Sequence, residues 1–216
     1  MSRSAHKLSH IFRQVLSATL VLMVLCGVLF PCLLTGLSSL IFPHQAAGSL
    51  VEVNDEVIGA EHVGQEFTED YFLWSRPSSC HYNVYREDEN GHRFYNDGSE
   101  FTGLASGSYN AGPSNPALSA RVESDLQAFL SKNPTVSADE VPTDLLTASG
   151  SGLDPHISPA AAAVQVPRIA EASGLSKTTV EEIIAQHTEG KVLGIFGENT
   201  VNVLAVNVDI AQKMGL

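Results

Sequence analysis

The sequence predicts a mixed α/β (α+β) domain, a small sheet with packed helices, on a single N-terminal transmembrane helix. Three observations predict this fold. The first 50 residues hold one long apolar run and no acidic residue, short β-branched runs follow, and the second half carries repeated helix-capping signals. We therefore divide the chain into a basic stub (1–14), a transmembrane helix (15–42) and a soluble domain (43–216). About 170 residues is enough for one hydrophobic core.

The apolar run covers residues 15–42 and lies in a gap between Arg13 and Glu52 that holds no charged residue. As a helix, its 28 residues reach roughly 42 Å, whereas a bilayer core measures about 30 Å. A kink at Pro31 is compatible with a membrane span. The small residues 46–48 suggest a signal-peptide cleavage site, but signal h-regions run about 7–15 residues. The length of the run therefore favours an uncleaved anchor.

The distribution of charge predicts the orientation. Arg3, Lys7 and Arg13 precede the helix, and basic residues are retained in the cytoplasm. We expect a single-pass protein of the plasma (inner) membrane with a cytoplasmic N-terminus and everything from about His44 onward outside. The rest of the chain holds all 24 acidic residues and nine of the 12 basic ones, so its net charge is 9 minus 24, or −15. That charge excludes nucleic-acid binding, which needs a basic surface, and favours accumulation of cations.

The cysteines predict neither a disulfide framework nor a metal site. Cys26 and Cys32 lie six residues apart in the apolar run and cannot pair with each other, and Cys80 is alone outside it. The sequence contains no CxxC or HExxH motif.

The first part of the soluble domain predicts a hairpin followed by irregular structure. Residues 49–67 contain two β-branched-rich runs around an Asn54–Asp55 turn. Residues 68–112 are rich in Gly, Ser, Asn, Asp and aromatic residues. Within them, residues 79–101 suggest an exposed loop with turns at Asn90–Gly91 and Asp97–Gly98.

Four helices are predicted after this region. The first begins after Ser114 or Asn115, with Pro116 in its first turn. The second starts at Ser158 with Pro159 at N1, stops near Gly174 and should kink at Pro167. The third is capped by Ser176, ends at Gly190 and carries Val180, Ile183, Ile184 and His187 on one face. Residues 200–213 fit both a strand and a helix, and we interpret them as a helix.

The most unusual stretch is "TASGSGLDPHISPAAA", residues 147–162. As a hydrolase site it would use Ser149 or Ser151 as nucleophile, His156 as base and Asp154 as orienting group. Residues so close in sequence rarely form a triad, and the GxSxG elbow is missing. The local pattern shows no catalytic residues.

Two further interpretations of this stretch remain. A Ser/Gly loop before a helix N-terminus can cradle an anion, but no lysine lies in this loop to reach a phosphate. The structural interpretation makes Gly150 and Gly152 a turn, Asp154 and Ser158 caps, and Pro159 the first helical residue. Spacing alone favours this structural interpretation.

Several motifs resemble, in order, those of the KdpC family, the C subunit of the Kdp potassium-transporting P-type ATPase. The resemblance covers nearly the whole chain, and the 147–159 block is specific. It departs from the family pattern at residues 73–75, at residues 106–110 and in a longer 79–101 stretch. The matching motifs are "QAAGSL", "GQEF", "RPS", "SNPAL", "VPTDLLTASGSGLDPHISPAAA", "QVPRIA" and "VNVLAVNVDI".

The resemblance implies an accessory subunit of a high-affinity potassium uptake complex. Its partners would be a channel-like subunit that selects potassium and a P-type ATPase subunit that hydrolyses ATP. This chain lacks the DKTGT phosphorylation motif, so it would not be catalytic alone. It would aid assembly and stability, with its helix, rich in small residues, in contact with partner helices and membrane lipid. An independent membrane-anchored binding module or hydrolase is the alternative from another class.

The family is also described as a catalytic chaperone that raises the ATP affinity of the hydrolysing subunit. The resemblance implies a nucleotide contact at Gln165 beside the loop residues Ser149, Gly150, Ser151 and Gly152. The resemblance implies no tightly bound cofactor. It implies bound ATP only in complex with the hydrolysing subunit. The charge bias, however, places Gln165 outside the cell, whereas ATP is inside. Either the orientation is inverted, the effect on ATP is indirect, or the domain caps the potassium entrance. We favour capping and assembly as primary roles, with the loop at a subunit contact.

Overall fold

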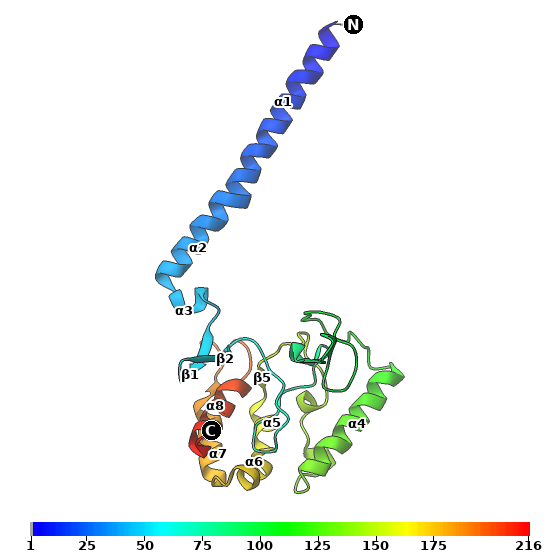
Figure 1. Cartoon of the computed structure of the whole chain (residues 1–216), viewed down its shortest axis with the longest axis vertical. Coiled ribbons are helices and arrows are strands. Elements are labelled where there is room, and N and C mark those ends of the chain that lie inside the picture. Colours follow the sequence, from blue (N-terminus) through cyan, green and yellow to red (C-terminus); the bar gives the residue numbers. More distant parts are fainter. Residues whose placement is uncertain (1) are drawn as a thin grey trace. The chain divides into compact units, whose positions relative to one another are not determined.

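The computed structural model describes residues 2–216, with side chains from residue 10 onward (Figure 1). The chain divides into two compact units, one ending at Leu50 and the other spanning Val51–Leu216. Each unit is described by itself.

The first unit is helical almost throughout. It consists of α1 (Ser2–Val24), a π-helical turn (Leu25–Leu29), α2 (Phe30–Ile41) and the short α3 (Pro43–Ala46). The helical stretch His10–Ile41 is long and apolar enough to cross a membrane. Instead of a kink at Pro31, which a membrane span would tolerate, the structure has the π-helical turn just before this proline. Proline lacks an N–H and its ring collides with the carbonyl four residues earlier, here that of Gly27, so the backbone widens there.

The second unit opens with the predicted hairpin. It pairs β1 (Leu50–Val53) with β2 (Glu56–Ala60). The two connecting residues, Asn54 and Asp55, have φ angles of 53° and 65°. Two successive left-handed residues form the tight turn that suits the twist of a two-stranded hairpin, and Asn and Asp tolerate this conformation best.

The irregular stretch that follows is more ordered than the sequence predicts. It contains a turn at His81–Asn83 and the two-residue strands β3 (Arg86–Glu87) and β4 (Arg93–Phe94), which pair antiparallel. The prediction that residues 79–101 form an exposed loop is therefore only partly correct. Cys80, Tyr82 and Tyr95 are buried, because their side chains pack under the loop rather than facing solvent.

The first long helix of this unit is α4 (Pro116–Lys132), as predicted. The side chain of Asn115 accepts a hydrogen bond from the backbone N–H of Ala117, and Pro116 occupies the first turn. Two 3₁₀ turns, Ala138–Glu140 and Thr143–Leu145, then lead to the Ser/Gly loop.

The predicted helix from Ser158 to Gly174 is two helices. These are α5 (Pro159–Ala163) and α6 (Val166–Ser173), with Gln165 at the break. The sequence predicts a kink at Pro167, but the chain breaks two residues earlier, because proline prevents the hydrogen bond that would continue the first helix. The predicted end is confirmed, since Gly174 adopts the left-handed φ of 74° that closes a helix.

The last segments correct two boundaries. Helix α7 (Lys177–Gln186) begins at the predicted cap but ends before Gly190, because Thr188–Glu189 forms strand β6. The segment predicted as one helix begins as β7 (Thr200–Asn202) and continues as α8 (Val203–Met214). Its β-branched beginning pairs with neighbouring strands, which explains the double signal in the sequence.

The largest sheet is small and three-stranded, with β7 between β6 and β5 (His156–Ile157), all antiparallel. Figure 1 shows α7 and α8 side by side, with α5 and α6 between this pair and α4. Buried apolar residues form the core, most of them from α5 to α8 and β7, with others from α4, β5 and the loops. It includes Leu73, Ile157, Ile169, Val180, Ile183, Val201, Val206 and Ile210. The mixed helix and small-sheet class predicted from the sequence is confirmed.

Candidate functional site around the Ser/Gly loop and Gln165

The Ser/Gly loop satisfies its own backbone with short side chains. The hydroxyl of Ser149 accepts from the N–H of Ser151, and that of Ser151 accepts from Leu153. The hydroxyl of Ser158 accepts from the N–H of Ala161, so Ser158 caps α5 as predicted. Its own N–H donates to a carboxylate oxygen of Asp144 at 2.7 Å. These bonds support the structural interpretation of the loop.

Gly152 is required by the closeness of its neighbours, not by a turn. It is buried, and a Cβ built on it would lie 2.4 Å from the sulfur of Cys80 and 2.8 Å from the carbonyl oxygen of Gly107. Its carbonyl accepts from the hydroxyl of Ser78 at 2.7 Å, and its N–H donates to the carbonyl of Ser106. Gly150, by contrast, is exposed and a Cβ there would meet no atom within 4 Å.

The residues considered for a triad are not arranged as one. Asp154 lies 3.9 Å from the ring nitrogen Nδ1 of His156, and its other role is to accept from the backbone N–H of His156. Among the described residues, neither Ser149 nor Ser151 forms a hydrogen bond with this histidine. Asp154 also pairs with Arg76 at 3.4 Å. These side chains therefore have structural roles. They hold the backbone of the loop, and Asp154 attaches the loop to the segment that carries Arg76.

Gln165 lies at the break between α5 and α6 and is completely buried. Its carbonyl oxygen accepts from the backbone N–H of Trp74 at 2.9 Å and from the guanidinium of Arg168 at 2.7 Å. Its amide donates to the carbonyls of Trp74 and Ala161. All the hydrogen-bonding groups of this side chain are thus used inside the protein.

Arg168 extends the same network. It is buried, stacks over the ring of Trp74 at 3.9 Å, and donates to the side chain of Asn133 and the backbone carbonyls of Asp70 and Phe72. Burial lowers the pKa of Arg168 to about 10, and the nearby carboxylate of Asp70 opposes that shift. The hydrogen bonds and the stacking compensate for removing this charge from water.

A second amide fixes the residue next to Trp74. Leu73 donates its N–H to Asn207 at 2.7 Å and accepts from the amide of Asn207 at 2.9 Å. The family resemblance pointed to Gln165, as a nucleotide contact, whereas neither Arg168 nor Asn207 was predicted. The available signal was a polar residue within the apolar face of a helix, Arg168 among Val166, Ile169 and Ala170 in α6 and Asn207 among Val203, Val206 and Ile210 in α8.

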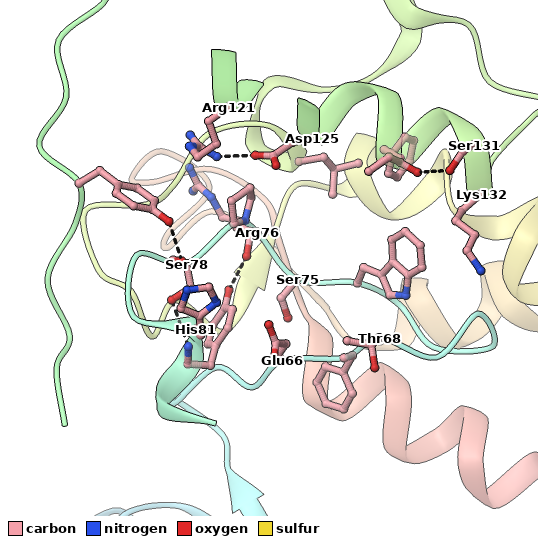
Figure 2. Close-up of a pocket in the computed structure, with 18 residues that line it drawn as sticks. Glu66, Thr68, Ser75, Arg76, Ser78, His81, Arg121, Asp125, Ser131 and Lys132 are labelled. Atoms are coloured by element: carbon pink, nitrogen blue, oxygen red, sulfur yellow. Dashed lines mark hydrogen bonds and ion pairs between the residues drawn. The ribbon is translucent and has the colours of Figure 1, made fainter. Parts of the chain in front are cut away.

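A pocket with a volume of about 550 Å³ lies between α4 and the segment around Trp74 (Figure 2). It is lined by aromatic and charged side chains, among them Trp74, Arg76, Tyr109, Arg121, Asp125 and Lys132. Gln165 and the four loop residues implied as a nucleotide contact are not among its lining residues. The structure therefore does not bring the implied nucleotide residues together in this pocket.

The cationic groups of the pocket already have acidic partners. Arg121 pairs with Asp125 at 2.5 Å, Arg76 with Asp154, and Lys132 with Asp70 at 2.9 Å. In Figure 2, Arg121 and Lys132 stand at opposite ends of the pocket. Burial raises the pKa of Asp125, and the adjacent Arg121 partly offsets that shift. The pocket thus presents balanced charge rather than a concentrated anion or cation site. Among residues 10–216, whose side chains are described, no group of three or more His, Cys, Asp or Glu is placed to hold a metal ion.

Comparison with known proteins defines the class. The family model described as "KdpC: K+-transporting ATPase, c chain" matches residues 12–212. Proteins named "Potassium-transporting ATPase KdpC subunit" are similar over almost their whole length. The relative from Clostridium kluyveri is 52% identical over 199 residues, covering 92% of this chain and 91% of its own. The relative from Clostridioides difficile is 46% identical over 209 residues, covering 94% and 98%. That from Methylococcus capsulatus is 44% identical over 197 residues, covering 91% and 95%.

These similarities define an accessory, non-catalytic subunit of a membrane transport ATPase. The chain belongs to the KdpC family, the c chain of the K⁺-transporting ATPase. The resemblance noted from the sequence motifs is confirmed, and family membership displaces the alternative of an independent binding module or hydrolase.

Proposed function

We propose that this subunit supports assembly and stability of the potassium-transporting complex from the extracytoplasmic side, and that its effect on ATP affinity is indirect. Its partners are the channel-like subunit and the ATP-hydrolysing subunit. The observation that carries the proposal is the state of Gln165, which is completely buried with every hydrogen-bonding group used. A nucleotide could reach this amide only after the core had opened.

The charge distribution along the chain supports placing the second unit on the extracytoplasmic side. The basic stub precedes a helix able to span a membrane, and the unit after it carries a large excess of acidic residues. Basic residues flanking a span remain on the cytoplasmic side. An acidic domain on the other side raises the local cation concentration, which suits a position over the potassium entrance.

The nucleotide hypothesis is tested most cleanly at the loop, because Ser149 and Ser151 can be changed without opening the core. We would purify the complex carrying Ser149→Ala and Ser151→Ala and measure the ATP concentration that gives half-maximal ATPase activity. An unchanged value is expected. A severalfold increase, with unchanged assembly, would show that nucleotide contacts this loop and would overturn the indirect mechanism.

The chaperone function itself has a separate test. The half-saturating ATP concentration of the complex is compared with that of the complex lacking this chain. We expect a higher value without the chain. Equal values in an intact remaining complex would leave assembly as the only role.

Orientation is tested by adding protease to cells that carry a C-terminal tag on this chain. The layers outside the plasma membrane are removed first, and the plasma membrane is left intact. Protease should remove the tag without lysis of the membrane. Protection of the tag until lysis would place the acidic unit in the cytoplasm.

A further inference from the structure

The pocket between α4 and the segment around Trp74 gathers basic residues on a strongly acidic unit. Residues 51–216 hold nine Lys and Arg residues. Three of the nine line this pocket: Arg76, Arg121 and Lys132. Two carboxylates, those of Glu66 and Asp125, line it as well. Its volume of about 550 Å³ lies within the range of about 300–1,000 Å³ that is typical of small-molecule sites, so a small organic ligand fits by size.

Two arginine nitrogens at this pocket lack a hydrogen-bond partner. Nε of Arg76 and Nη2 of Arg121 are buried, and neither has an acceptor among the described residues. The bonds from Arg76 to Asp154 and to the carbonyl of Thr147 are both 3.4 Å, beyond the usual range of about 2.7–3.2 Å. A buried N–H without an acceptor is unfavourable. An oxygen acceptor bound in the pocket would satisfy these donors after a small rotation of the arginine side chains.

Part of the pocket wall is a strained turn. His81, Tyr82 and Asn83 all have left-handed backbone, with φ angles of 48°, 53° and 58°. Residues with a Cβ adopt this conformation at a cost and usually singly, so three in succession are unusual. The hydroxyl of Ser78 accepts from the N–H of Tyr82 at 3.1 Å, and Asn83 exchanges two hydrogen bonds of 2.9 Å with the backbone of Ala105. Strain held in this way is typical of binding sites, and both His81 and Tyr82 line the pocket.

Another part of the wall is aromatic and held in place. The ring of Trp74 is stacked by Arg168 at 3.9 Å and meets Phe129 edge-on, with ring centroids 6.4 Å apart. The guanidinium of Arg121 lies over the ring of Tyr109 at 5.1 Å. Figure 2 shows Arg76 and Arg121 toward the same end of the pocket. Rigid aromatic surface beside directional donors suits a ligand with an apolar body and an oxygen acceptor.

We propose that this pocket binds a small organic carboxylate, with its carboxylate on Arg76 and Arg121 and its apolar body against Trp74. A carboxylate matches the forked donors of a guanidinium, which can bind both oxygens at once. The near balance of charge favours a single carboxylate over a polyanion, because a triphosphate would be repelled by Glu66 and Asp125. The site is therefore not a nucleotide site, and it does not rest on the proposed function.

The first test uses the detergent-solubilised full-length chain and two probes of the same shape, hydrocinnamate and its neutral primary amide. Ligand-observed NMR measures binding, and the fluorescence of Trp74, the only tryptophan, reports whether binding occurs in this pocket. We expect saturable binding of hydrocinnamate with a change in Trp74 fluorescence, and at least tenfold weaker binding of the amide. Equal affinities, no binding, or binding without a response of Trp74 would overturn the proposal.

Variants separate this site from general attraction of anions. Arg76→Gln and Arg121→Gln should each weaken hydrocinnamate binding at least tenfold. Arg86→Gln is the matched control, because it removes the same charge from an exposed residue outside the pocket, and it should bind like the wild type. Unchanged affinity in a folded pocket variant, or an equal loss in the control, contradicts the assignment. If both pocket variants fail to fold, the two probes on the wild-type chain still decide.

A last measurement distinguishes a free ligand from a carboxylate supplied by a partner subunit. Hydrocinnamate binding is compared between the purified ATPase complex with the wild-type chain and the complex with Arg76→Gln. We expect the wild-type complex to bind more of the probe. No difference between the complexes, when the isolated wild-type chain does bind, would mean that a partner fills or covers the pocket and would overturn its assignment to a free ligand.

Discussion

Gln165 and Trp74 exchange two hydrogen bonds although 91 residues separate them in sequence. The Trp74 N–H donates to the Gln165 carbonyl at 2.9 Å, and the Gln165 amide donates back to the Trp74 carbonyl at 3.3 Å. The side chain of Gln165 thus bonds both backbone groups of Trp74, as a neighbouring strand would, although this segment forms no strand. Asn207 does the same for Leu73, so two amides position one extended segment against the core.

Replacing Gln165 with Leu should destabilise the second unit by about 2–4 kcal/mol, because the buried groups of Trp74 and Arg168 would lose their partners. Trp74 is the only tryptophan, so its fluorescence follows denaturant unfolding of the detergent-solubilised chain directly. Gln127→Leu is the control, since Gln127 is exposed on α4 and its amide donates to the exposed Glu123. Equal shifts for both variants would contradict the structural role of Gln165.

Gly152→Ala should destabilise the fold by about 1–3 kcal/mol, the usual effect of overpacking a tight site. The added methyl group would collide with the Cys80 sulfur and the Gly107 carbonyl. Gly150→Ala, two residues away, meets nothing within 4 Å and should be neutral. Urea midpoints of the two variants measure the difference. A neutral Gly152→Ala would mean that residues around Cys80 move freely.

The thiol of Cys80 should react slowly with a thiol reagent in the native protein. Its side chain is 4% exposed and packs against Gly152. In a chain carrying Cys26→Ala and Cys32→Ala, we expect the reaction to accelerate by at least tenfold when the domain unfolds, or with Gly152→Ala. Rapid labelling of the folded wild-type chain would place Cys80 on an accessible surface instead.

The half-buried carboxyl of Asp125 should make the free energy of unfolding depend on pH. Burial raises its pKa above that of the unfolded chain, although Arg121 opposes this shift. The folded state therefore binds more protons than the unfolded state around the pH where this carboxyl titrates, so this group's contribution to stability falls as pH rises through that range. Asp125→Asn should remove this slope, whereas Asp139→Asn, at an exposed site, should leave it. Denaturation midpoints between about pH 3.5 and 6 check the prediction.

The sequence predicted the parts of the fold that depend on neighbouring residues. The apolar run of residues 15–42, a cap at Ser114 or Asn115, the caps of Ser158 and Ser176, and the Gly174 helix end are local signals. The structure confirms the helices and caps, with Asn115 as the cap of α4. Boundaries failed where strands of two residues formed, because β6 and β7 exist only through pairing with each other and with β5.

By itself, the sequence determined the long apolar helix, the sign of the charge, most of the helix starts and the family, because periodicity, capping and motif order are properties of adjacent residues. Only the tertiary structure decided the environment of Gln165 and the need for glycine at 152. Each depends on atoms brought together from distant segments: Trp74 around Gln165, and Cys80 and Gly107 against Gly152.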